Sequence, residues 1–292
     1  MKLERLSPCK VNLVLNILGK RPDGFHELET LMQPVNVCDI LTFVKQPGTD
    51  ITLTCSEPSL PVDGTNLVVR AARSFFETCG ISDGVRIHLE KRIPLAAGLG
   101  GGSGNAANTL LGLNQLFDGP LSPDDLWKIA ASLGSDVPFF LQSKPALAVG
   151  RGEQVSALDP FPALAGRAIF LIHPGFGIST AWAYQNLARF PTALAGKPGL
   201  AAKAASLLSA DDMTGAASLF YNSLEAPALE KYPILSIFQE YLKACGANVA
   251  LMSGSGSTTF AIFENLAAAE AVVPEFKARF GAECWASVVP MD

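Results

Sequence analysis

The sequence predicts an α+β protein of two lobes, residues 1–160 and residues 161–292. Two observations predict this class. Segments with strand patterns lead the first part of the chain, whereas helix and strand patterns alternate in the second part. The chain has 292 residues, of which 49% are hydrophobic and 17% charged, so each lobe can bury a core.

The first lobe is led by strand-like segments. The segment "RPDG" at residues 21–24 has Pro and Gly at the second and fourth positions of a type I turn. Residues 85–92 alternate apolar and polar side chains, which is typical of a strand with one buried face. Further strand candidates are "KVNLVLNILGK" (10–20), "ETLMQPV" (29–35), "DILTFVKQ" (39–46) and "DITLTCS" (50–56).

Three helices are predicted in the same lobe. The segment "NLVVRAARSFFETCG" (66–80) has apolar residues at helical spacing and ends at Gly80, a C-cap candidate. A second helix runs from about residue 105 to 117, after a run of glycines. A third, "SPDDLWKIAASLG" (122–134), has Ser122 as its N-cap and acidic residues in its first turn.

The sequence pattern changes after about residue 161, where the predicted second lobe begins. Residues 195–245 are rich in alanine and predicted to be helical. The remaining predicted elements are the strands "RAIFLIHPG" (167–175), "NVALMSG" (248–254), "TTFAIF" (258–263) and "CWASVVP" (284–290), and the helix "NLAAAEAVVPEFKARFG" (265–281). No internal repeat or low-complexity segment is evident.

Composition and charge exclude several classes of protein. The net charge is −5 and no cluster of Lys and Arg stands out, so nucleic acid is not an expected partner. The six cysteines are scattered without a CxxC pair, which favours reduced thiols over disulfides or a zinc site. No apolar run is long enough to span a bilayer, and a cytoplasmic protein without membrane contact is expected.

A run of five glycines between residues 98 and 104 raises three interpretations. No lysine follows the run, so a Walker A loop is excluded. "GSGNAA" (102–107) satisfies the dinucleotide pattern GxGxxA, but the preceding strand alternates, unlike a buried parallel strand. The third interpretation is a phosphate site made by glycine N–H groups and a helix N-terminus. We favour it over a plain tight turn, which needs fewer glycines.

A second glycine stretch, "SGSGSTTF" (253–260), links two predicted strands. It is equally consistent with a plain hairpin turn and with a second phosphate-binding loop. Two such loops in one chain favour phosphate binding more than either loop does alone.

Four segments together resemble the GHMP kinases, which are small-molecule ATP kinases: "PCKVNLVLNILGKRPDGFHEL" (8–28), "IPLAAGLGGGSGNAA" (93–107), "GSDVPFF" (134–140) and "SGSGSTTFAIF" (253–263). Within this superfamily, the first segment resembles the branch whose acceptor is an alcohol linked to cytidine diphosphate. The resemblance implies a ribosomal-protein-like N-terminal lobe and a ferredoxin-like C-terminal lobe. One departure is Gly104, where the family commonly has serine.

The resemblance also implies the catalytic residues and the ligands. Asp136 would be the general base, with Lys10 beside it to stabilise the transferring phosphoryl group. From the residues alone, a helix cap is the favoured interpretation of Asp136, and a surface lysine is the favoured interpretation of Lys10. ATP is the implied cosubstrate, with Mg²⁺ bound mainly through substrate phosphates and no metal site built by the protein.

The resemblance implies the remaining binding residues one by one. The cytidine pocket would contain Phe25 and Tyr184 as stacking rings and His26 as a hydrogen-bonding group. Asn12 would contact the alcohol, and Thr180 would lie near the diphosphate. The ATP site would comprise Pro94, Ala96, Ala97, Gly98, Leu99, Gly100, Gly101, Gly102, Ser103, Gly104 and Asn105; Gly254, Ser255 and Gly256 would contact substrate.

Three rival functions remain open. Another GHMP kinase, of the homoserine or mevalonate type, would lack the segment "RPDGFHEL" (21–28). A non-catalytic nucleotide sensor on the same fold would not need both Lys10 and Asp136. An RNA-binding module is disfavoured by the negative net charge. We expect a monomer or a weak homodimer.

Overall fold

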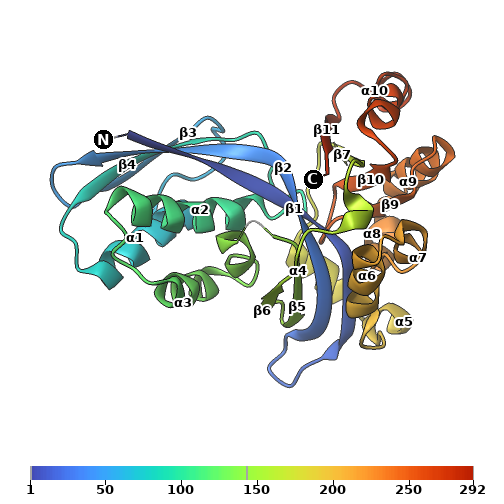
Figure 1. Cartoon of the computed structure of the whole chain (residues 1–292), viewed down its shortest axis with the longest axis horizontal. Coiled ribbons are helices and arrows are strands. Elements are labelled where there is room, and N and C mark those ends of the chain that lie inside the picture. The colour runs from blue at the N-terminus through green and yellow to red at the C-terminus, as the bar shows by residue number, and fades with distance from the viewer. Residues whose placement is uncertain (1, 143, 292) are drawn as a thin grey trace. The chain divides into compact units, whose positions relative to one another are not determined.

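The computed structural model describes residues 2–142 and 144–291. The chain forms two compact units, each made of several segments (Figure 1). Unit 1 contains residues 2–9, 37–93 and 100–142, and unit 2 contains residues 10–36, 94–99 and 144–291. The α+β class and the predicted order of elements are confirmed.

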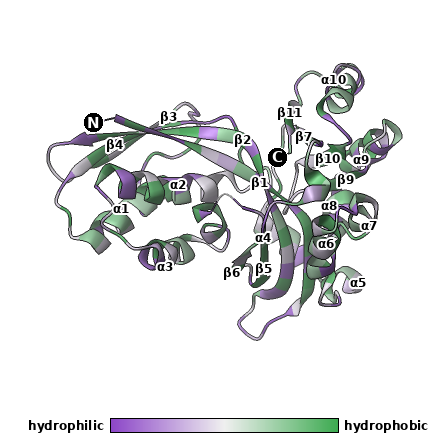
Figure 2. Ribbon diagram, in the orientation of Figure 1, coloured by the Kyte–Doolittle hydropathy of each residue, from purple (hydrophilic) through white to green (hydrophobic). Residues whose placement is uncertain are grey.

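Unit 1 places three helices beside a sheet. Strand β4 pairs antiparallel with the end of β2 and parallel with β3, and α1 packs against α2. Figure 2 shows both hydrophobic and hydrophilic residues along α1. Its buried residues recur at helical spacing, as expected for a helix with one buried face: Val68, Val69, Ala71, Ala72, Phe75 and Phe76. The elements are the beginning of β1 (Lys2–Lys20), the end of β2 (His26–Gln46), β3 (Ile51–Cys55), α1 (Leu67–Cys79), β4 (Gly84–Glu90), α2 (Gly101–Leu116), α3 (Pro123–Leu133) and the 3₁₀ helix η1 (Pro138–Leu141).

Local signals explain where the helices of unit 1 begin and end. The Asn66 side chain accepts the N–H of Val68 at the start of α1, and Gly80 ends this helix with a φ of 64°. Ser122 accepts the N–H of Asp125 at 3.2 Å and starts α3, as predicted. These interactions satisfy N–H and C=O groups that a helix end leaves without partners.

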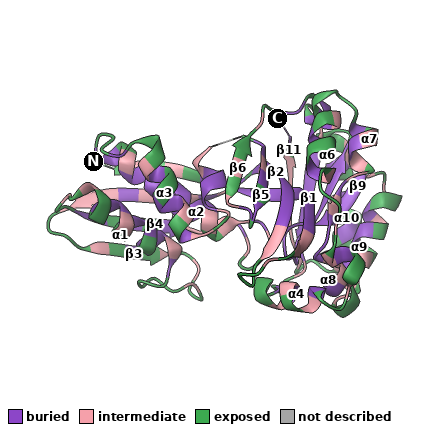
Figure 3. Cartoon of the chain, turned by 90° about the horizontal axis from the view of Figure 1, so that it is seen from below, coloured by how far each residue is buried: buried purple, intermediate pink, exposed green. Residues whose placement is uncertain are grey.

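Unit 2 contains a four-stranded antiparallel sheet in the order β11-β7-β10-β9. Strands β7, β9 and β10 are buried along their whole length, which explains their continuous apolar sequences. Figure 3 shows further buried residues along β1 and β2. The elements are β5 (Ala146–Gly150), β6 (Gln154–Ala157), η2 (Pro162–Leu164), β7 (Ala168–His173), α4 (Thr180–Leu187), α5 (Pro191–Leu194), α6 (Leu200–Ser209), α7 (Met213–Ala217), β8 (Tyr221–Asn222), α8 (Glu225–Lys231), α9 (Ile234–Ala244), β9 (Val249–Met252), β10 (Thr259–Phe263), α10 (Leu266–Phe280) and β11 (Trp285–Pro290).

The structure differs from the sequence-based prediction in several places. The predicted strands at 29–35 and 39–46 are parts of the single strand β2. The short strands β5, β6 and β8 were not predicted, because so few residues carry little periodicity. Helix α2 begins at Gly101 rather than near residue 105, so three of the glycines lie within it. Glycine can adopt helical φ and ψ angles as other residues do. The glycine-rich composition alone did not indicate that the helix begins within the run.

The predicted division near residue 160 lies inside unit 2. Unit 2 contains residues from both predicted lobes, whereas unit 1 lies wholly within the first predicted lobe. The division of the chain into lobes 1–160 and 161–292 therefore stays a prediction. Within residues 2–142 and 144–291, no helix combines the length and the apolar character needed to cross a membrane.

Candidate active site

The glycine-rich segment joins β4 to α2. Gly98 and Gly100 have left-handed backbones, with φ angles of 76° and 71°, which glycine adopts without a steric penalty. Gly100 immediately precedes α2, and its carbonyl accepts the N–H of Gly104 at 2.9 Å. The first N–H groups of a helix have no partner inside it. The segment therefore offers donors and the positive end of the helix dipole to an anion.

Two other glycines of this segment have contrasting surroundings. A Cβ at Gly104 would lie 2.9 Å from the carbonyl oxygen of Pro8, so any side chain at this position would require the backbone to shift. A Cβ at Gly102 would have Leu67 Cδ1 as its nearest described neighbour, at an ordinary 3.7 Å. Packing therefore explains Gly104 but not the exposed Gly102. The missing side chain at Gly102 fits the close approach of a ligand.

The second Gly/Ser loop, residues 253–258, joins β9 to β10 and packs on the glycine-rich segment within unit 2. Thr258 donates its N–H to the carbonyl of Ala97 at 3.1 Å, and Ser253 Oγ donates to the carbonyl of Gly98 at 3.0 Å. A Cβ at Gly98 would lie only 2.1 Å from the Ser253 carbonyl oxygen. The two backbones can approach this closely because residue 98 is glycine.

The predicted substrate contacts of Gly254, Ser255 and Gly256 stay predictions. All three residues are buried. The Ser255 hydroxyl lies 2.9 Å from the hydroxyl of Thr180, at the first residue of α4. Two predicted substrate residues far apart in sequence are therefore neighbours.

Asn222 and Glu225 support this loop and were not predicted from the sequence. Asn222 Nδ2 donates to the carbonyls of Met252 and Gly254 at 2.7 and 2.8 Å. The Glu225 carboxyl accepts the Met252 N–H at 2.7 Å and Gln239 Nε2 at 2.6 Å. Burial raises the pKa of Glu225 to about 7, and the hydrogen bonds from Met252 and Gln239 reduce that rise. No local pattern in the sequence marks these two residues.

We expect the Glu225→Gln variant to gain stability at alkaline pH. The raised pKa means that the folded state binds this proton more tightly than the unfolded chain. The stability from this proton is fully present below the ordinary carboxyl pKa of 4.5 and is lost as the pH rises through about 7. The amide is neutral at every pH, and its oxygen can accept both existing hydrogen bonds.

The measurement is the free energy of unfolding in urea between pH 4 and pH 8.5. The variant should match the parent protein at the acidic end and exceed it by up to about 3 kcal/mol at the alkaline end. The exposed Glu264→Gln serves as the control. A difference between the Glu225 variant and the parent that is independent of pH would show that folding does not raise the pKa of this carboxyl.

Lys10 and Asn12 lie side by side on β1. Lys10 donates its backbone N–H to the Leu99 carbonyl at 3.0 Å, and its ammonium donates to Asn12 Oδ1 at 2.6 Å. Asn12 Nδ2 in turn donates to Thr30 Oγ1 at 2.8 Å. Lys10 is only 4% exposed, so it is not the surface lysine that its sequence context also allowed. Within unit 2, Lys10 is attached to the glycine-rich segment through Leu99.

Asp136 lies in the turn between α3 and η1, in unit 1. Val137, not Asp136, is the residue that precedes η1, so the interpretation of Asp136 as a helix cap is wrong. Helix η1 packs on α2, where a Cβ at Gly104 would lie 3.5 Å from Phe140 Cδ1. Asp136 therefore belongs to the same unit as the start of α2. Lys10 belongs to unit 2, and its predicted pairing with Asp136 stays a prediction.

The residues predicted for the cytidine pocket lie in unit 2. The rings of His26 and Tyr184 are 5.0 Å apart and tilted by 35°. Burial, and then the charge of Lys20, lower the pKa of His26. His26 is therefore neutral near pH 7 and has one ring nitrogen to donate and one to accept. Phe25 is 55% exposed, and the guanidinium carbon of Arg151 lies 4.7 Å from its ring centre.

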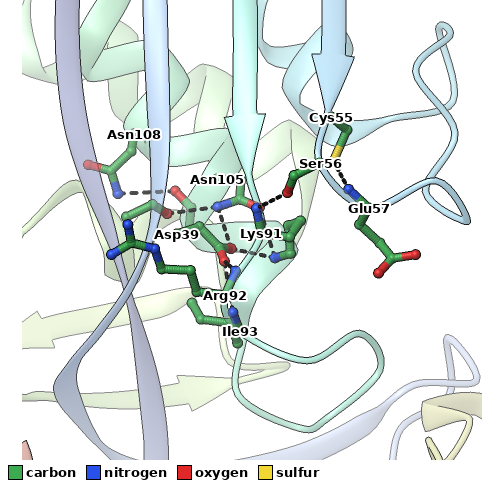
Figure 4. A network of polar contacts seen from close by, with 11 residues as sticks. Asp39, Cys55, Ser56, Glu57, Lys91, Arg92, Ile93, Asn105 and Asn108 are labelled. Carbon is green, nitrogen blue, oxygen red and sulfur yellow. Dashed lines mark hydrogen bonds and ion pairs between the residues drawn. The ribbon is translucent and has the colours of Figure 1, made fainter.

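A buried polar network in unit 1 was also not predicted (Figure 4). Asp39, in the middle of β2, contacts Lys91, Arg92 and Ile93 after β4 and Asn105 on α2. Asp39 was not identified because its segment reads as an ordinary strand. The Asn105 side chain, predicted to bind ATP, is 2% exposed and points into this network. An ATP contact by Asn105 stays a prediction, and the Asn105 side chain is already hydrogen-bonded within this network.

Two family models match the chain. "GHMP kinases N terminal domain" matches residues 66–144, and "GHMP kinases C terminal" matches residues 193–282. A homoserine kinase structure from Cytophaga hutchinsonii superposes with a TM-score of 0.77 at 20% identity, over 100% of this chain and 94% of that one, which shows a shared fold. The fold and the glycine-rich segment thus define a kinase of the GHMP class.

More similar proteins narrow the class. The 4-diphosphocytidyl-2-C-methyl-D-erythritol kinase of Geobacter sp. (strain M21) is 41% identical over 96% of both chains. That of Gloeobacter violaceus is 43% identical over 93% of this chain and 89% of its own. A crystal structure of 4-(cytidine 5'-diphospho)-2C-methyl-D-erythritol kinase superposes with a TM-score of 0.82, at 35% identity over 99% of each chain. The chain belongs to the 4-diphosphocytidyl-2-C-methyl-D-erythritol kinase family.

Proposed function

We propose that the chain transfers the γ-phosphoryl group of ATP to the 2-hydroxyl of 4-diphosphocytidyl-2-C-methyl-D-erythritol, a step of non-mevalonate isoprenoid precursor synthesis. The observation that carries this proposal is the 41% identity to a kinase of that name over 96% of the chain. The glycine-rich segment, with its helix N-terminus and its uncrowded Gly102, supports the ATP half of the reaction.

The proposed mechanism uses few groups. The N–H groups of residues 98–103 bind the ATP phosphates, and the dipole of α2 adds positive potential. The Asp136 carboxylate accepts the proton of the 2-hydroxyl as its oxygen attacks the γ-phosphorus, and ADP leaves with the electrons of the broken P–O bond. The ammonium of Lys10 stabilises negative charge on the transferring group. Asn12, hydrogen-bonded to Lys10, orients the acceptor alcohol.

Magnesium would enter this site as its complex with ATP. Among residues 2–142 and 144–291, no group of three or more His, Cys, Asp or Glu side chains is arranged to hold a metal ion. Mg²⁺ commonly keeps phosphate and water oxygens as ligands, so the residues present fit an ion that the nucleotide carries in. When bound, the ion neutralises charge on the β- and γ-phosphates.

The cytosine ring of the acceptor would be bound by the aromatic residues of unit 2. The rings of Phe25 and Tyr184 provide stacking surfaces, and stacking accepts any flat base. Selectivity for cytosine must therefore come from hydrogen bonds, and the neutral His26 can both donate and accept them. Thr180, at the start of α4, and its neighbour Ser255, in the loop between β9 and β10, would lie near the diphosphate.

A coupled assay of ADP release tests the function. The purified protein is given ATP, Mg²⁺ and one acceptor at a time: the cytidine-linked erythritol, its uridine analogue, homoserine or mevalonate. We expect efficient turnover with the cytidine compound alone. Turnover with homoserine or mevalonate would move the chain to another GHMP activity. ATP binding without turnover on any acceptor would favour a nucleotide sensor.

The Tyr184→Ala variant should bind the acceptor more weakly, and its binding of ATP should not change. Loss of one stacking ring is worth about 1–3 kcal/mol, so the KM for the cytidine substrate should rise roughly 10-fold or more. The KM for ATP should stay unchanged. Tyr184→Phe keeps the ring and should behave like the parent enzyme. His26→Ala should instead narrow the preference for the cytidine over the uridine substrate. If Tyr184→Ala raised the KM for ATP and spared the acceptor, this pocket would be wrongly assigned.

A further inference from the structure

The carboxylate of Asp39 accepts four N–H donors inside unit 1. Its Oδ1 accepts the backbone N–H groups of Arg92 and Ile93 at 2.8 and 2.9 Å. Its Oδ2 accepts the ammonium of Lys91 and, at 2.9 Å, the side-chain amide of Asn105. The Asp39 side chain is 0% exposed and that of Lys91 is 6% exposed. Both oxygens therefore have two donors each, which uses their full capacity.

These donors belong to the two ends of the glycine-rich segment. Arg92 and Ile93 immediately precede residues 94–104, and Asn105 immediately follows them. Figure 4 shows Asp39 between these two groups, with Lys91 beside Asn105. Asn105 is further held by donating to Ser7 Oγ at 3.0 Å. A single carboxylate thus fixes both ends of the segment that we propose for ATP.

General stability is a poor explanation for this arrangement. Removing two charges from water is costly, and apolar side chains of similar volume commonly stabilise a protein as well as a buried ion pair does. A fully hydrogen-bonded carboxylate, however, specifies one geometry, because each donor must lie in its own direction. A segment held at both ends also has less conformational freedom to lose when a ligand binds.

We propose that Asp39 is a positioning residue for ATP: it orders residues 94–104 before the nucleotide arrives, without touching the nucleotide itself. This inference rests on the proposed function, in which that segment binds the ATP phosphates. It assigns to β2, far from the glycine run in sequence, a role in nucleotide affinity that is separate from the binding of the acceptor.

The Asp39→Asn variant breaks this arrangement at constant volume. An amide has one accepting oxygen and one NH₂ donor group. If its oxygen faces Arg92 and Ile93, its NH₂ group faces the donors of Lys91 and Asn105. If the amide is turned over, the NH₂ group faces the two backbone N–H groups. In either orientation the new NH₂ group faces other N–H donors, and the buried ammonium of Lys91 loses its carboxylate partner.

The test compares this variant with Glu29→Gln. Glu29 is a second buried carboxylate on β2, where it accepts the N–H groups of Gly199 and Leu200 at 2.8 Å, at the start of α6. Binding of a non-hydrolysable ATP analogue with Mg²⁺ is measured by calorimetry. Asp39→Asn should raise the Kd by about 10- to 100-fold, the range typical of groups that orient metal ligands through hydrogen bonds. The Kd of the cytidine substrate should not change, and Glu29→Gln should change neither value.

Hydrogen exchange gives a readout of the segment itself. Amides of residues 94–104 should exchange faster in Asp39→Asn than in the parent protein, while those of α10 should not. Should Asp39→Asn fail to fold, Asn105→Ala removes only the helix-side attachment and should show a smaller change of the same kind. Unchanged nucleotide affinity and unchanged exchange in a folded variant would overturn the proposal. A parent protein that binds no ATP analogue would refute the proposed function, and the exchange rates would still decide the role of Asp39.

Discussion

The Asp136→Asn variant is expected to lose roughly 10²–10⁴-fold in kcat while it keeps its fold and its affinity for ATP. An alcohol must lose its proton as its oxygen attacks phosphorus, and a neutral amide cannot accept that proton. Asp136 is half-buried in a turn, and Val137 rather than Asp136 is the residue that precedes η1. The side chains of Asp and Asn are also nearly equal in volume.

Three measurements separate a catalytic from a structural effect of this change. Steady-state kinetics with the cytidine substrate gives kcat, calorimetry with an ATP analogue gives nucleotide affinity, and urea unfolding gives stability. The matched control is Asp159→Asn, whose carboxylate is 92% exposed and pairs with Lys144 at 3.3 Å. The control should leave all three values unchanged. Turnover near the parent value in Asp136→Asn would reject Asp136 as the base.

The Gly98→Ala variant is expected to lose both stability and nucleotide binding. The new Cβ would lie 2.1 Å from the Ser253 carbonyl oxygen and 2.9 Å from the backbone N of Gly256, so backbone must move. The φ of 76° adds the cost of a left-handed conformation. Overpacking and backbone strain together should lower the free energy of unfolding by about 2–5 kcal/mol. The displaced loop should also bind ATP at least about tenfold more weakly.

Gly102→Ala is the matched comparison, because Gly102 is helical and uncrowded. Alanine at this position should leave the stability unchanged or raise it by up to about 1 kcal/mol. If phosphates approach this turn closely, nucleotide affinity should nevertheless fall. Urea unfolding and calorimetry on both variants decide the matter. Tight ATP binding by Gly102→Ala would reject the phosphate site at this glycine, and full stability of Gly98→Ala would contradict the contact with the second loop.

Local sequence features determined the class of the fold and most of its elements. The caps at Gly80 and Ser122 act within one or two helical turns, so they could be recognised without knowledge of partners. Alternation along residues 85–90 indicated the buried face of β4 for the same reason. The motifs around Lys10, residues 93–107 and Asp136 indicated the kinase family, which the comparisons confirm.

Only the tertiary structure decided which residues support the site. The glycine at 98 is required by a loop far along the chain, and the glycine at 104 by the backbone of Pro8. Asp39 and Glu225 read as ordinary residues of a strand and a helix, yet each hydrogen-bonds a segment distant in sequence. A sequence pattern reports the periodicity of one element and carries no information on what packs against it. Close backbone contacts and buried carboxylates depend on that neighbour, which is why folding had to bring the segments together before their roles could be recognised.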